Sequence, residues 1–489
     1  MALVLKSARE KPVESGIGLA EVGDHTPELP SMKRLPLRTL EMARLSLPLA
    51  AMEIPVVATI ATDTVALGRL DSRAVAAGGL GAAVFLLVSS ICVSVIASVG
   101  HEAAYRAGQQ DRRRVLGTLY GGAVLSCVLG CSAAIFTVAL SPFLYVLGQD
   151  HTVARDAAVY LYAVSPGLPF LLLAVCFRGT VALQPHAIRL VGVAASSVAL
   201  KILFVATAWV CLPKADMSSR SALLICGLTS SITFAAMSAS AWLAHRRSQV
   251  ADGASPGPDQ TVQGAYRVIR RGVTIGLTTA LQSGFFTFVA ILCGQCSSAD
   301  LAAHQIANQC TLLPLMFAFG MSQATTTLTS RAIGARSPEE ARRASWDGVW
   351  FSIGAMSLVA LALMLCGKVA INAILPEGTP DRDHVANIAW RLVVVGACCL
   401  VADGVQNVAM GALRGFGQGR LTVHNAVIGY WLVGIPFAWW LGRACGLGAT
   451  GVWIGVGIGL HASAALLLFF LYQATRSAAN PPERSSRAQ

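Results

Sequence analysis

Long apolar stretches recur along almost the whole chain and are separated by short polar ones. Twelve such segments lie near residues 40–67, 77–104, 115–140, 154–182, 188–211, 220–244, 270–295, 301–328, 345–373, 385–412, 420–442 and 446–473. About 20 apolar residues suffice for a helix to cross the hydrocarbon core of a bilayer. Because lipid offers no hydrogen-bond partners, a spanning segment satisfies its backbone internally, as a helix does. The pattern predicts an all-α membrane protein with twelve transmembrane helices.

The composition changes between the sixth and seventh segments. Residues 247–268 include the run Ser255-Pro256-Gly257-Pro258-Asp259, which is typical of a linker. We therefore expect an N-terminal six-helix lobe at 39–246, a linker at 247–268 and a C-terminal six-helix lobe at 269–475. Residues 1–38 and 476–489 are predicted to be polar tails. The first lacks the pattern of a signal peptide, and we expect it to be disordered.

Lysine and arginine are distributed unevenly among the connections. The loops after the even-numbered segments, together with the linker, carry far more of them than the loops after the odd-numbered segments. Such an excess marks the cytosolic side of a membrane protein. We therefore expect both tails and the linker to be cytosolic, in a cell membrane and specifically a bacterial inner membrane.

The two predicted lobes share short sequence matches in the same order. These are Ala76-Ala77 with Ala302-Ala303, Gly108 with Gly334, and Arg178-Gly179 with Arg414-Gly415. Equivalent segments run in the same direction in each half, which predicts a pseudo-two-fold axis along the membrane normal. Internal repeats of this kind occur in transporters, where two bundles enclose a central site.

Composition narrows the class of protein further. The 489 residues are 55% hydrophobic and only 13% charged, with a mean hydropathy of +0.62. The formal charge of +12 lies in loops and tails, so it does not indicate nucleic-acid binding. Most of the 13 cysteines lie in apolar runs, and Cys293-x-x-Cys296 has no second pair, so we expect no metal site.

Sequence patterns of enzymes and ATP-driven pumps are absent. The chain has no serine–histidine–acid grouping and no glycine-rich phosphate loop that ends in Lys-Ser or Lys-Thr. We expect neither an enzyme nor a cofactor.

A few ionisable residues fall deep within the predicted helices. They are Glu53 and Asp63 in the first segment, Lys201 in the fifth, and Arg391 and Asp403 in the tenth. A charge at bilayer depth is costly, so it normally faces an internal cavity and marks an ion, proton or substrate path. Two plainer interpretations stay open: Asp63 at a helix end near the interface, and Asp403 hydrogen-bonded to Gln406 or Asn407 on its own turn.

Four short motifs resemble the multidrug and toxic compound extrusion (MATE) family of cation-coupled antiporters. They are Asp63-Thr64-Val65 followed by Gly68-Arg69, Ala302-Ala303-His304-Gln305-Ile306-Ala307, Gly411-Ala412-Leu413-Arg414-Gly415, and Tyr430-Trp431-Leu432-Val433-Gly434-Ile435-Pro436. The resemblance runs from about residue 40 to 475. It implies export of small organic compounds, drugs or toxic metabolites, driven by H⁺ or Na⁺ across the lipid bilayer, with no nucleic acid as partner. We also expect a monomer.

The resemblance also assigns individual residues. Asp63 matches the family's carboxylate in the first lobe, and Asp403 matches its carboxylate in the tenth helix. The chain departs from the family at Gln282, where sodium-coupled members have glutamate, and at Ser197 and Lys201, where asparagine or aspartate is usual. These departures favour protons over sodium as the coupling ion. Candidates for lining the cavity are Glu53, Ser197, Gln282, Tyr162 and Phe286, although aromatic residues more often serve packing.

These observations lead to one functional prediction and two alternatives. We predict a cation-coupled exporter with Asp63, Asp403 and Lys201 at its coupling sites. We also consider that Lys201 reaches Asp63 and forms a buried ion pair that proton binding breaks. A flippase of lipid-linked saccharides would usually have two further spanning segments, and a non-transporting scaffold would not need a carboxylate in each half.

Overall fold

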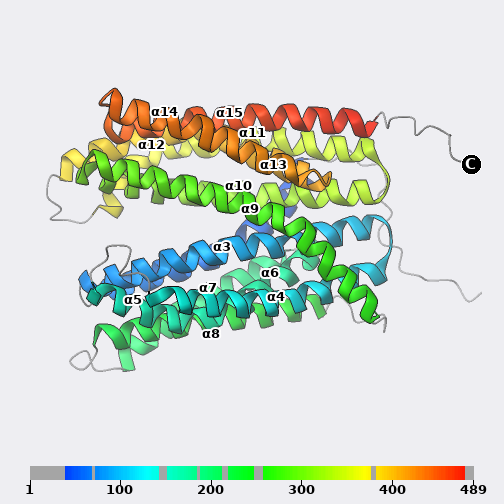
Figure 1. Cartoon of the computed structure of the whole chain (residues 1–489), viewed down its shortest axis with the longest axis horizontal. Helices are drawn as coiled ribbons and strands as arrows, with labels where there is room; N and C mark the ends of the chain where they lie inside the picture. Colours follow the sequence, from blue (N-terminus) through cyan, green and yellow to red (C-terminus); the bar gives the residue numbers. More distant parts are fainter. Residues whose placement is uncertain are drawn as a thin grey trace, which may run out of the picture. The chain divides into compact units, whose positions relative to one another are not determined.

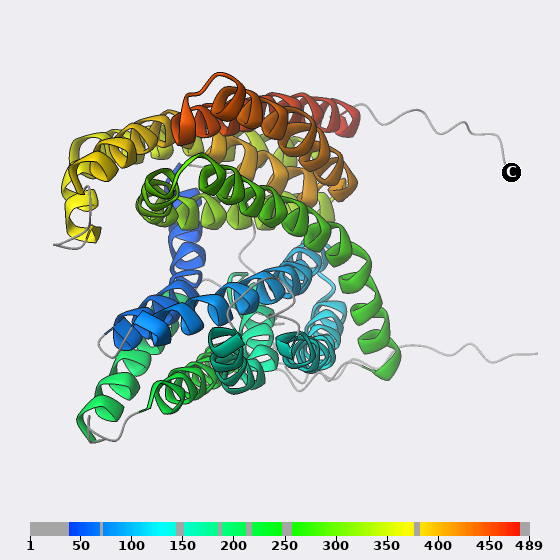
Figure 2. The same ribbon diagram turned by 60° about the vertical axis from the view of Figure 1, so that its left-hand side comes forward.

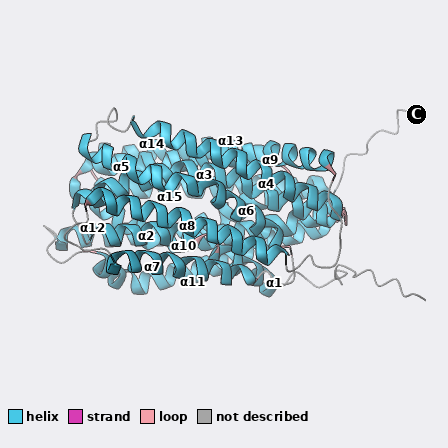
Figure 3. Ribbon diagram, turned by 90° about the horizontal axis from the view of Figure 1, so that it is seen from below, coloured by secondary structure: helices cyan, strands magenta, loops and turns pink. Residues whose placement is uncertain are grey.

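The computed structural model describes residues 39–68, 72–142, 151–183, 188–211, 218–246, 257–375 and 382–479. These residues form helices joined by short turns, and no strand occurs among them (Figure 3). The expected tail at 1–38, residues 480–489 of the expected tail at 476–489, and linker residues 247–256 lie outside the described residues, whereas residues 476–479 are helical. The all-α prediction is therefore confirmed for the part of the chain that the structure covers.

The first half of the chain forms eight helices. They are α1 (Thr39–Ala51), α2 (Ile54–Gly68), α3 (Ser72–Gly108), α4 (Arg112–Leu140), α5 (His151–Val164), α6 (Leu168–Val181), α7 (Arg189–Cys211) and α8 (Ser219–Arg246). A 3₁₀ turn, Ser165–Gly167, joins α5 to α6, so that the two form one continuous stretch, His151–Val181. Pro166 and Pro169 lie at this joint, where their missing N–H groups disfavour an unbroken α-helix.

The second half of the chain forms seven helices in the described residues. They are α9 (Pro258–Cys296), α10 (Ser298–Gly334), α11 (Pro338–Ile374), α12 (Arg382–Gly415), α13 (Gly419–Asn425), α14 (Ile435–Trp439) and α15 (Gly448–Ala479). Two π-helical stretches, Ala426–Gly434 and Trp440–Ala444, flank α14 and connect it with α13 in one stretch, Gly419–Ala444. Residues 258–268 of the expected linker are the first three turns of α9.

Eleven described stretches are long and apolar enough to cross a membrane. α10 is also long, at 37 residues, but its first half carries the polar residues Asp300, His304 and Asn308. Together with α10, the helices match the twelve spanning segments expected from the sequence. Their outer faces are apolar: on α4, Val124, Val128 and Ile135 are all exposed, as lipid-facing residues are.

The helices form two bundles, and the first helix of each bundle also packs on the other one. Figure 1 shows the helices from α3 to α8 on one side and α10 to α15 on the other. α1 packs on α10, and the first part of α9 packs on α3 and α4. In Figure 2 the dark blue first span and the green α9 both run between the bundles. The boundary between the lobes therefore crosses α1 and α9 rather than coinciding with the linker alone.

The contacts between the bundles that involve α3 come from its second half. Ser94 accepts a hydrogen bond from Thr279 at 2.8 Å, and Ser98 donates to the Val268 carbonyl at 2.9 Å. His101 is hydrogen-bonded to Gln323 of α10 at 3.0 Å. We refer to the end of the bundle where α3 and α10 finish and α9 begins as the linker end, and to the opposite end as the far end.

Candidate functional site

A buried ion pair lies inside the first lobe. Asp63 on α2 is 3% exposed and Lys201 on α7 is 1% exposed. The Lys201 Nζ lies 2.6 Å from the Asp63 Oδ1. The ion pair considered from the sequence is therefore present, and it joins α2 to α7 in the apolar interior of the bundle.

Two further side chains hold the carboxylate of Asp63. The Tyr160 hydroxyl, from α5, donates to Oδ2 at 3.1 Å, and the Ser230 hydroxyl, from α8, donates to the same atom at 2.9 Å. Hydrogen bonds to an ionised carboxylate are stronger than neutral ones. Asp63 is thus attached to three neighbouring helices, which excludes the interpretation of an exposed residue at the membrane interface.

Of the two tyrosines on α5, Tyr160 contacts Asp63, whereas Tyr162, expected from the sequence to line the cavity, does not. Tyr162 is 48% exposed, and its hydroxyl contacts Ser141 rather than the interior. Tyr160 is two residues earlier, so its side chain points about 200° away around the helix. Helix-face periodicity distinguishes the two tyrosines, but the sequence alone does not reveal which face of α5 is turned toward Asp63.

Lys201 is also hydrogen-bonded to neutral oxygen atoms of α8. Its Nζ donates to the Cys226 carbonyl at 3.0 Å and to the Thr229 and Ser230 hydroxyls at 2.9 Å each. An ammonium has three N–H donors, and here four oxygen atoms, including the carboxylate, surround it. The lysine therefore has enough acceptors to remain buried and hydrogen-bonded without the carboxylate.

Two other candidates in the first lobe lie differently from Asp63. Ser197, one turn before Lys201, is buried and donates to the Val193 carbonyl of its own helix at 2.7 Å. Glu53, in the turn between α1 and α2, forms an ion pair with Arg178 of α6 at 2.6 Å. α2 is thus fixed by one ion pair just before its first residue and by another near its end.

In the second lobe, Asp403 on α12 is hydrogen-bonded within its own helix. Gln406 donates to its Oδ1 at 2.7 Å and Asn407 donates to the same atom at 3.1 Å. The sequence analysis left open that Asp403 is hydrogen-bonded to Gln406 or Asn407 on its own turn, and the structure contains both hydrogen bonds. No cation of the protein pairs with Asp403 among the ion pairs of the described residues.

Gln282 belongs to a hydrogen-bonded chain that leads to Asp403. Its side-chain amide donates to the Tyr430 hydroxyl at 2.9 Å, and that hydroxyl donates to Gln406 at 3.0 Å. Tyr430 lies in the π-helical stretch Ala426–Gly434 and is fully buried. The sequence analysis named Tyr430 only within a motif and did not assign it to a site.

A small cavity of about 90 Å³ adjoins Asp403. Phe286, His304, Asn308 and Trp453 contribute to its wall. The Trp453 indole N–H donates to His304 Nδ1 at 3.0 Å. The cavity therefore combines one carboxylate with aromatic surface, and of the expected lining residues it includes Phe286. Within the described ranges, no group of three or more His, Cys, Asp or Glu side chains could hold a metal ion.

The fold and these sites define a class: a membrane transporter built from two six-helix bundles, with titratable groups buried in each. The sequence profile of the MatE family matches residues 48–207 and 274–440. The chain belongs to this family, the MATE transporters, and is therefore a multi-pass transporter of small compounds and not an enzyme. The resemblance seen in the motifs is confirmed.

Bacterial relatives match most of the chain. A protein of Pseudomonas aeruginosa described as probable multidrug resistance protein NorM is 32% identical over 439 residues, which cover 88% of this chain and 89% of that protein. Multidrug resistance protein NorM of Burkholderia vietnamiensis is 29% identical over 451 residues, covering 92% of this chain and 96% of that protein.

Solved structures share the fold at low sequence identity. The eukaryotic MATE transporter AtDTX14 matches with a TM-score of 0.76 and 17% identity, covering 90% of this chain and 98% of that chain. A multidrug resistance MATE family transporter in an outward-facing conformation matches with a TM-score of 0.78 and 17% identity, covering 90% and 96% of the two chains. These similarities concern the fold only.

Proposed function

We propose that the protein is a proton-coupled antiporter that exports small organic compounds, including drugs, by alternating access. The relatives described as multidrug resistance proteins support drugs as the substrate class. We place the protein in a bacterial inner membrane as a monomer, with the linker end and both termini in the cytosol. The excess of basic residues at that end supports this orientation.

The ion pair between Asp63 and Lys201 is the observation that carries the proposal. A sodium site requires several oxygen ligands in a ring around the ion. Here the ammonium of Lys201 already lies 2.6 Å from the carboxylate, in the place that a second cation would have to share. Gln282, in the second lobe, adds no negative charge. A proton needs only the carboxylate oxygen itself, so protons suit this site better than sodium.

Proton binding at Asp63 would weaken the attachment of α2. A neutral carboxyl group no longer attracts the ammonium, while Lys201 keeps its three oxygen partners on α8. The charge of Lys201 thus stays with α7 and α8, and α2 loses its ionic link to them. This adds to the expectation that proton binding breaks the ion pair: the ammonium then remains hydrogen-bonded to α8.

The magnitude of this effect is sufficient for coupling. Breaking one side of a buried ion pair costs about 3–5 kcal/mol. Since 1.4 kcal/mol is about one factor of ten, the cost corresponds to about two to three and a half decades in a two-state equilibrium. A ligand shifts such an equilibrium only through its different affinity for the two states. The proton does so here if Asp63 is paired in one state and unpaired in the other.

Asp403 has a supporting role in this proposal. It accepts hydrogen bonds from two amides, and it faces a cavity with aromatic walls. We assign it to the second cation-coupling site, where it binds a proton or the positive group of a substrate. The chain from Gln282 through Tyr430 holds Gln406, and therefore Asp403, in position.

Transport by reconstituted protein tests the proposal. We expect Asp63→Asn to abolish pH-gradient-driven uptake of a fluorescent cation, such as ethidium, into everted proteoliposomes, because the titratable group is lost. Glu339→Gln, at an exposed position on α11, is the matched control and should transport normally.

Replacing sodium by choline at constant pH should leave wild-type transport unchanged. Full activity of a well-folded Asp63→Asn protein would disprove the role of Asp63, and loss of transport in choline would favour sodium coupling.

A further inference from the structure

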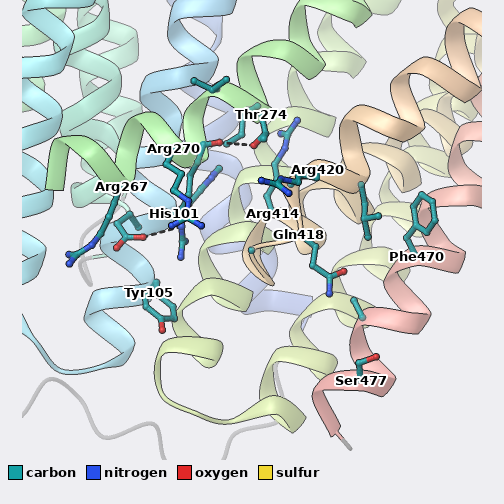
Figure 4. Close-up of a pocket in the computed structure, with 18 of the residues that line it drawn as sticks. His101, Tyr105, Arg267, Arg270, Thr274, Arg414, Gln418, Arg420, Phe470 and Ser477 are labelled. Atoms are coloured by element: carbon teal, nitrogen blue, oxygen red, sulfur yellow. Dashed lines mark hydrogen bonds and ion pairs between the residues drawn. The ribbon is translucent and has the colours of Figure 1, made fainter. Parts of the chain in front are cut away.

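A large basic cavity opens at the linker end, away from the Asp63 ion pair. Its volume is about 1150 Å³. One part of its wall is the end of α3, and the other parts come from α9, the turn between α12 and α13, and α15 (Figure 4). The cavity thus takes residues from both bundles.

Arginine dominates the wall of this cavity. It is lined by Arg106, Arg267, Arg270, Arg271, Arg414 and Arg420, with Glu102 as the one acidic residue among its lining. Glu102 is already bound by Arg106 at 2.8 Å and by Arg271 at 3.1 Å. Like charges in one cavity repel each other, and one carboxylate balances only one of the six guanidinium groups. An anion entering the cavity would relieve this repulsion.

Two of these arginines have buried donors that lack a partner. The Nε of Arg414 and the Nη1 of Arg271 are inaccessible to solvent and have no hydrogen-bond partner among the described residues. A buried donor without a partner is costly, so it points to a ligand that can accept from it. Figure 4 shows Arg270, Arg414 and Arg420 among the residues that line this cavity.

The internal repeat gives an independent argument. Arg178-Gly179 and Arg414-Gly415 are counterparts in the two lobes. Arg178 is neutralised by Glu53 at 2.6 Å, whereas Arg414 has no ion-pair partner in the described part of the chain. The second lobe therefore keeps the arginine but offers no carboxylate of its own to balance it.

We propose that this cavity binds a phosphate-bearing anion, either the headgroup of an anionic phospholipid or a soluble phosphate compound. The planar guanidinium group donates two parallel hydrogen bonds to phosphate, and several converging arginines suit a ligand with more than one charged oxygen. The cavity is much larger than a single inorganic ion. An anion that contacts both α3 and the α12–α13 turn also helps to hold the two bundles together at the linker end.

Binding of inorganic pyrophosphate to the purified, delipidated full-length protein tests the soluble form of the ligand. Titration calorimetry at constant ionic strength should show binding, and Arg270→Gln with Arg420→Gln should weaken it about tenfold or more. Both residues are exposed, so the double variant should still fold, which size-exclusion chromatography verifies. Arg342→Gln with Arg476→Gln removes the same charge from exposed positions that do not line the cavity, and it should bind as the wild type does.

Lipid retention tests the membrane form of the ligand. After reconstitution in nanodiscs of phosphatidylcholine with phosphatidylglycerol, native mass spectrometry should find phosphatidylglycerol retained by the wild type and by the Arg342/Arg476 control. The Arg270/Arg420 variant should lose it.

Pyrophosphate binding alone indicates a soluble ligand, and lipid retention alone indicates a headgroup. The proposal is overturned if neither probe binds, or if the control variant loses binding equally. Asp63→Asn should bind normally, so this result is independent of the transport mechanism.

Discussion

At the scale of single residues, the structure explains how a lysine can occupy the middle of a transmembrane bundle. A buried ion pair is stable only if the remaining donors and acceptors are also satisfied. Lys201 meets this condition through Asp63 on one side and three oxygen atoms of α8 on the other. The pair is therefore accommodated by the structure of the first lobe, and it leads to two predictions.

The first prediction concerns the coupling of the two charges. Lys201→Asn should retain part of the transport activity but shift its pH dependence, because an uncharged donor replaces the ammonium beside Asp63. It should also make transport sensitive to sodium, since the competing charge is gone. Lys201→Met removes the donors as well and should be inactive.

A double-mutant cycle provides the control for this prediction. If the residues act as a pair, Asp63→Asn combined with Lys201→Asn should be no less stable than Asp63→Asn alone, measured as the melting temperature in differential scanning fluorimetry. Losses that simply add would show that the two residues act independently.

The second prediction separates Tyr160 from Tyr162. Tyr160→Phe removes one hydrogen bond to the carboxylate, which is worth about 1.5 kcal/mol for a charged acceptor. The pH profile of transport should therefore move upward by about one unit. Tyr162→Phe, two residues away on the exposed face, should leave the profile unchanged. An equal shift in both variants would contradict the assigned roles.

At the scale of elements, glycines allow α3 and α10 to touch at the linker end. A side chain on Gly108 would overlap the Arg331 backbone, and one on Gly334 would overlap the Tyr105 backbone. The two glycines are counterparts in the sequence repeat, so each lobe contributes one glycine to the close contact between the helices. Without a Cβ, the backbones of two helices can approach closely and pack over their whole contact.

The third prediction tests this contact. Gly108→Val should force α3 away from α10 and destabilise the conformation seen here by about 1–3 kcal/mol. We expect a lower melting temperature in differential scanning fluorimetry and several-fold slower transport. Gly79 lies on the same helix with open space around it, so Gly79→Val is the control and should have little effect on either measurement. Equal behaviour of the two variants would argue against a close helix contact at Gly108.

At the scale of the whole molecule, the first helix of each bundle also packs on the other bundle. The second half of α3 forms hydrogen bonds that join the two bundles. Because equivalent segments run in the same direction in both halves, the connections after the second, fourth, sixth, eighth and tenth spanning segments lie at the linker end. The proposed alternating access would require these contacts between the bundles to open. The orientation of the bundle in the membrane then decides which end faces the cytosol.

The fourth prediction determines that orientation with a native side chain. Cys445 is exposed in the turn before α15 at the far end. A membrane-impermeant maleimide added to intact cells should label it, and Cys445→Ser should lose most of the label. Ser477→Cys in that background lies at the linker end and should react only after permeabilisation. Labelling of Ser477→Cys in intact cells would reverse the proposed topology.

Helix number, fold class and family were predictable from the sequence because each depends on local patterns. A run of apolar residues is sufficient for a spanning helix, and motifs such as Gly411-Ala412-Leu413-Arg414-Gly415 are contiguous. The boundaries were less predictable. The first three turns of α9, residues 258–268, mix polar and apolar residues, and Gly264 in this segment packs closely against Gly117 and Gly121 of α4.

The sequence by itself located Asp63 and Lys201 inside a bundle, because a charged residue in the middle of an apolar run normally faces the interior. The same reasoning was wrong for Arg391, which is exposed, and it did not single out the buried Glu102 and Asp156. Only the tertiary structure decided the partners of Asp63 and Asp403. The partners Tyr160, Ser230 and Tyr430 come from other helices. Their distances from the two carboxylates depend on how each helix is rotated about its axis. Hydrophobic periodicity does not fix this rotation when every face of a helix is apolar. The basic cavity likewise exists only because separate helices bring their arginines to one place.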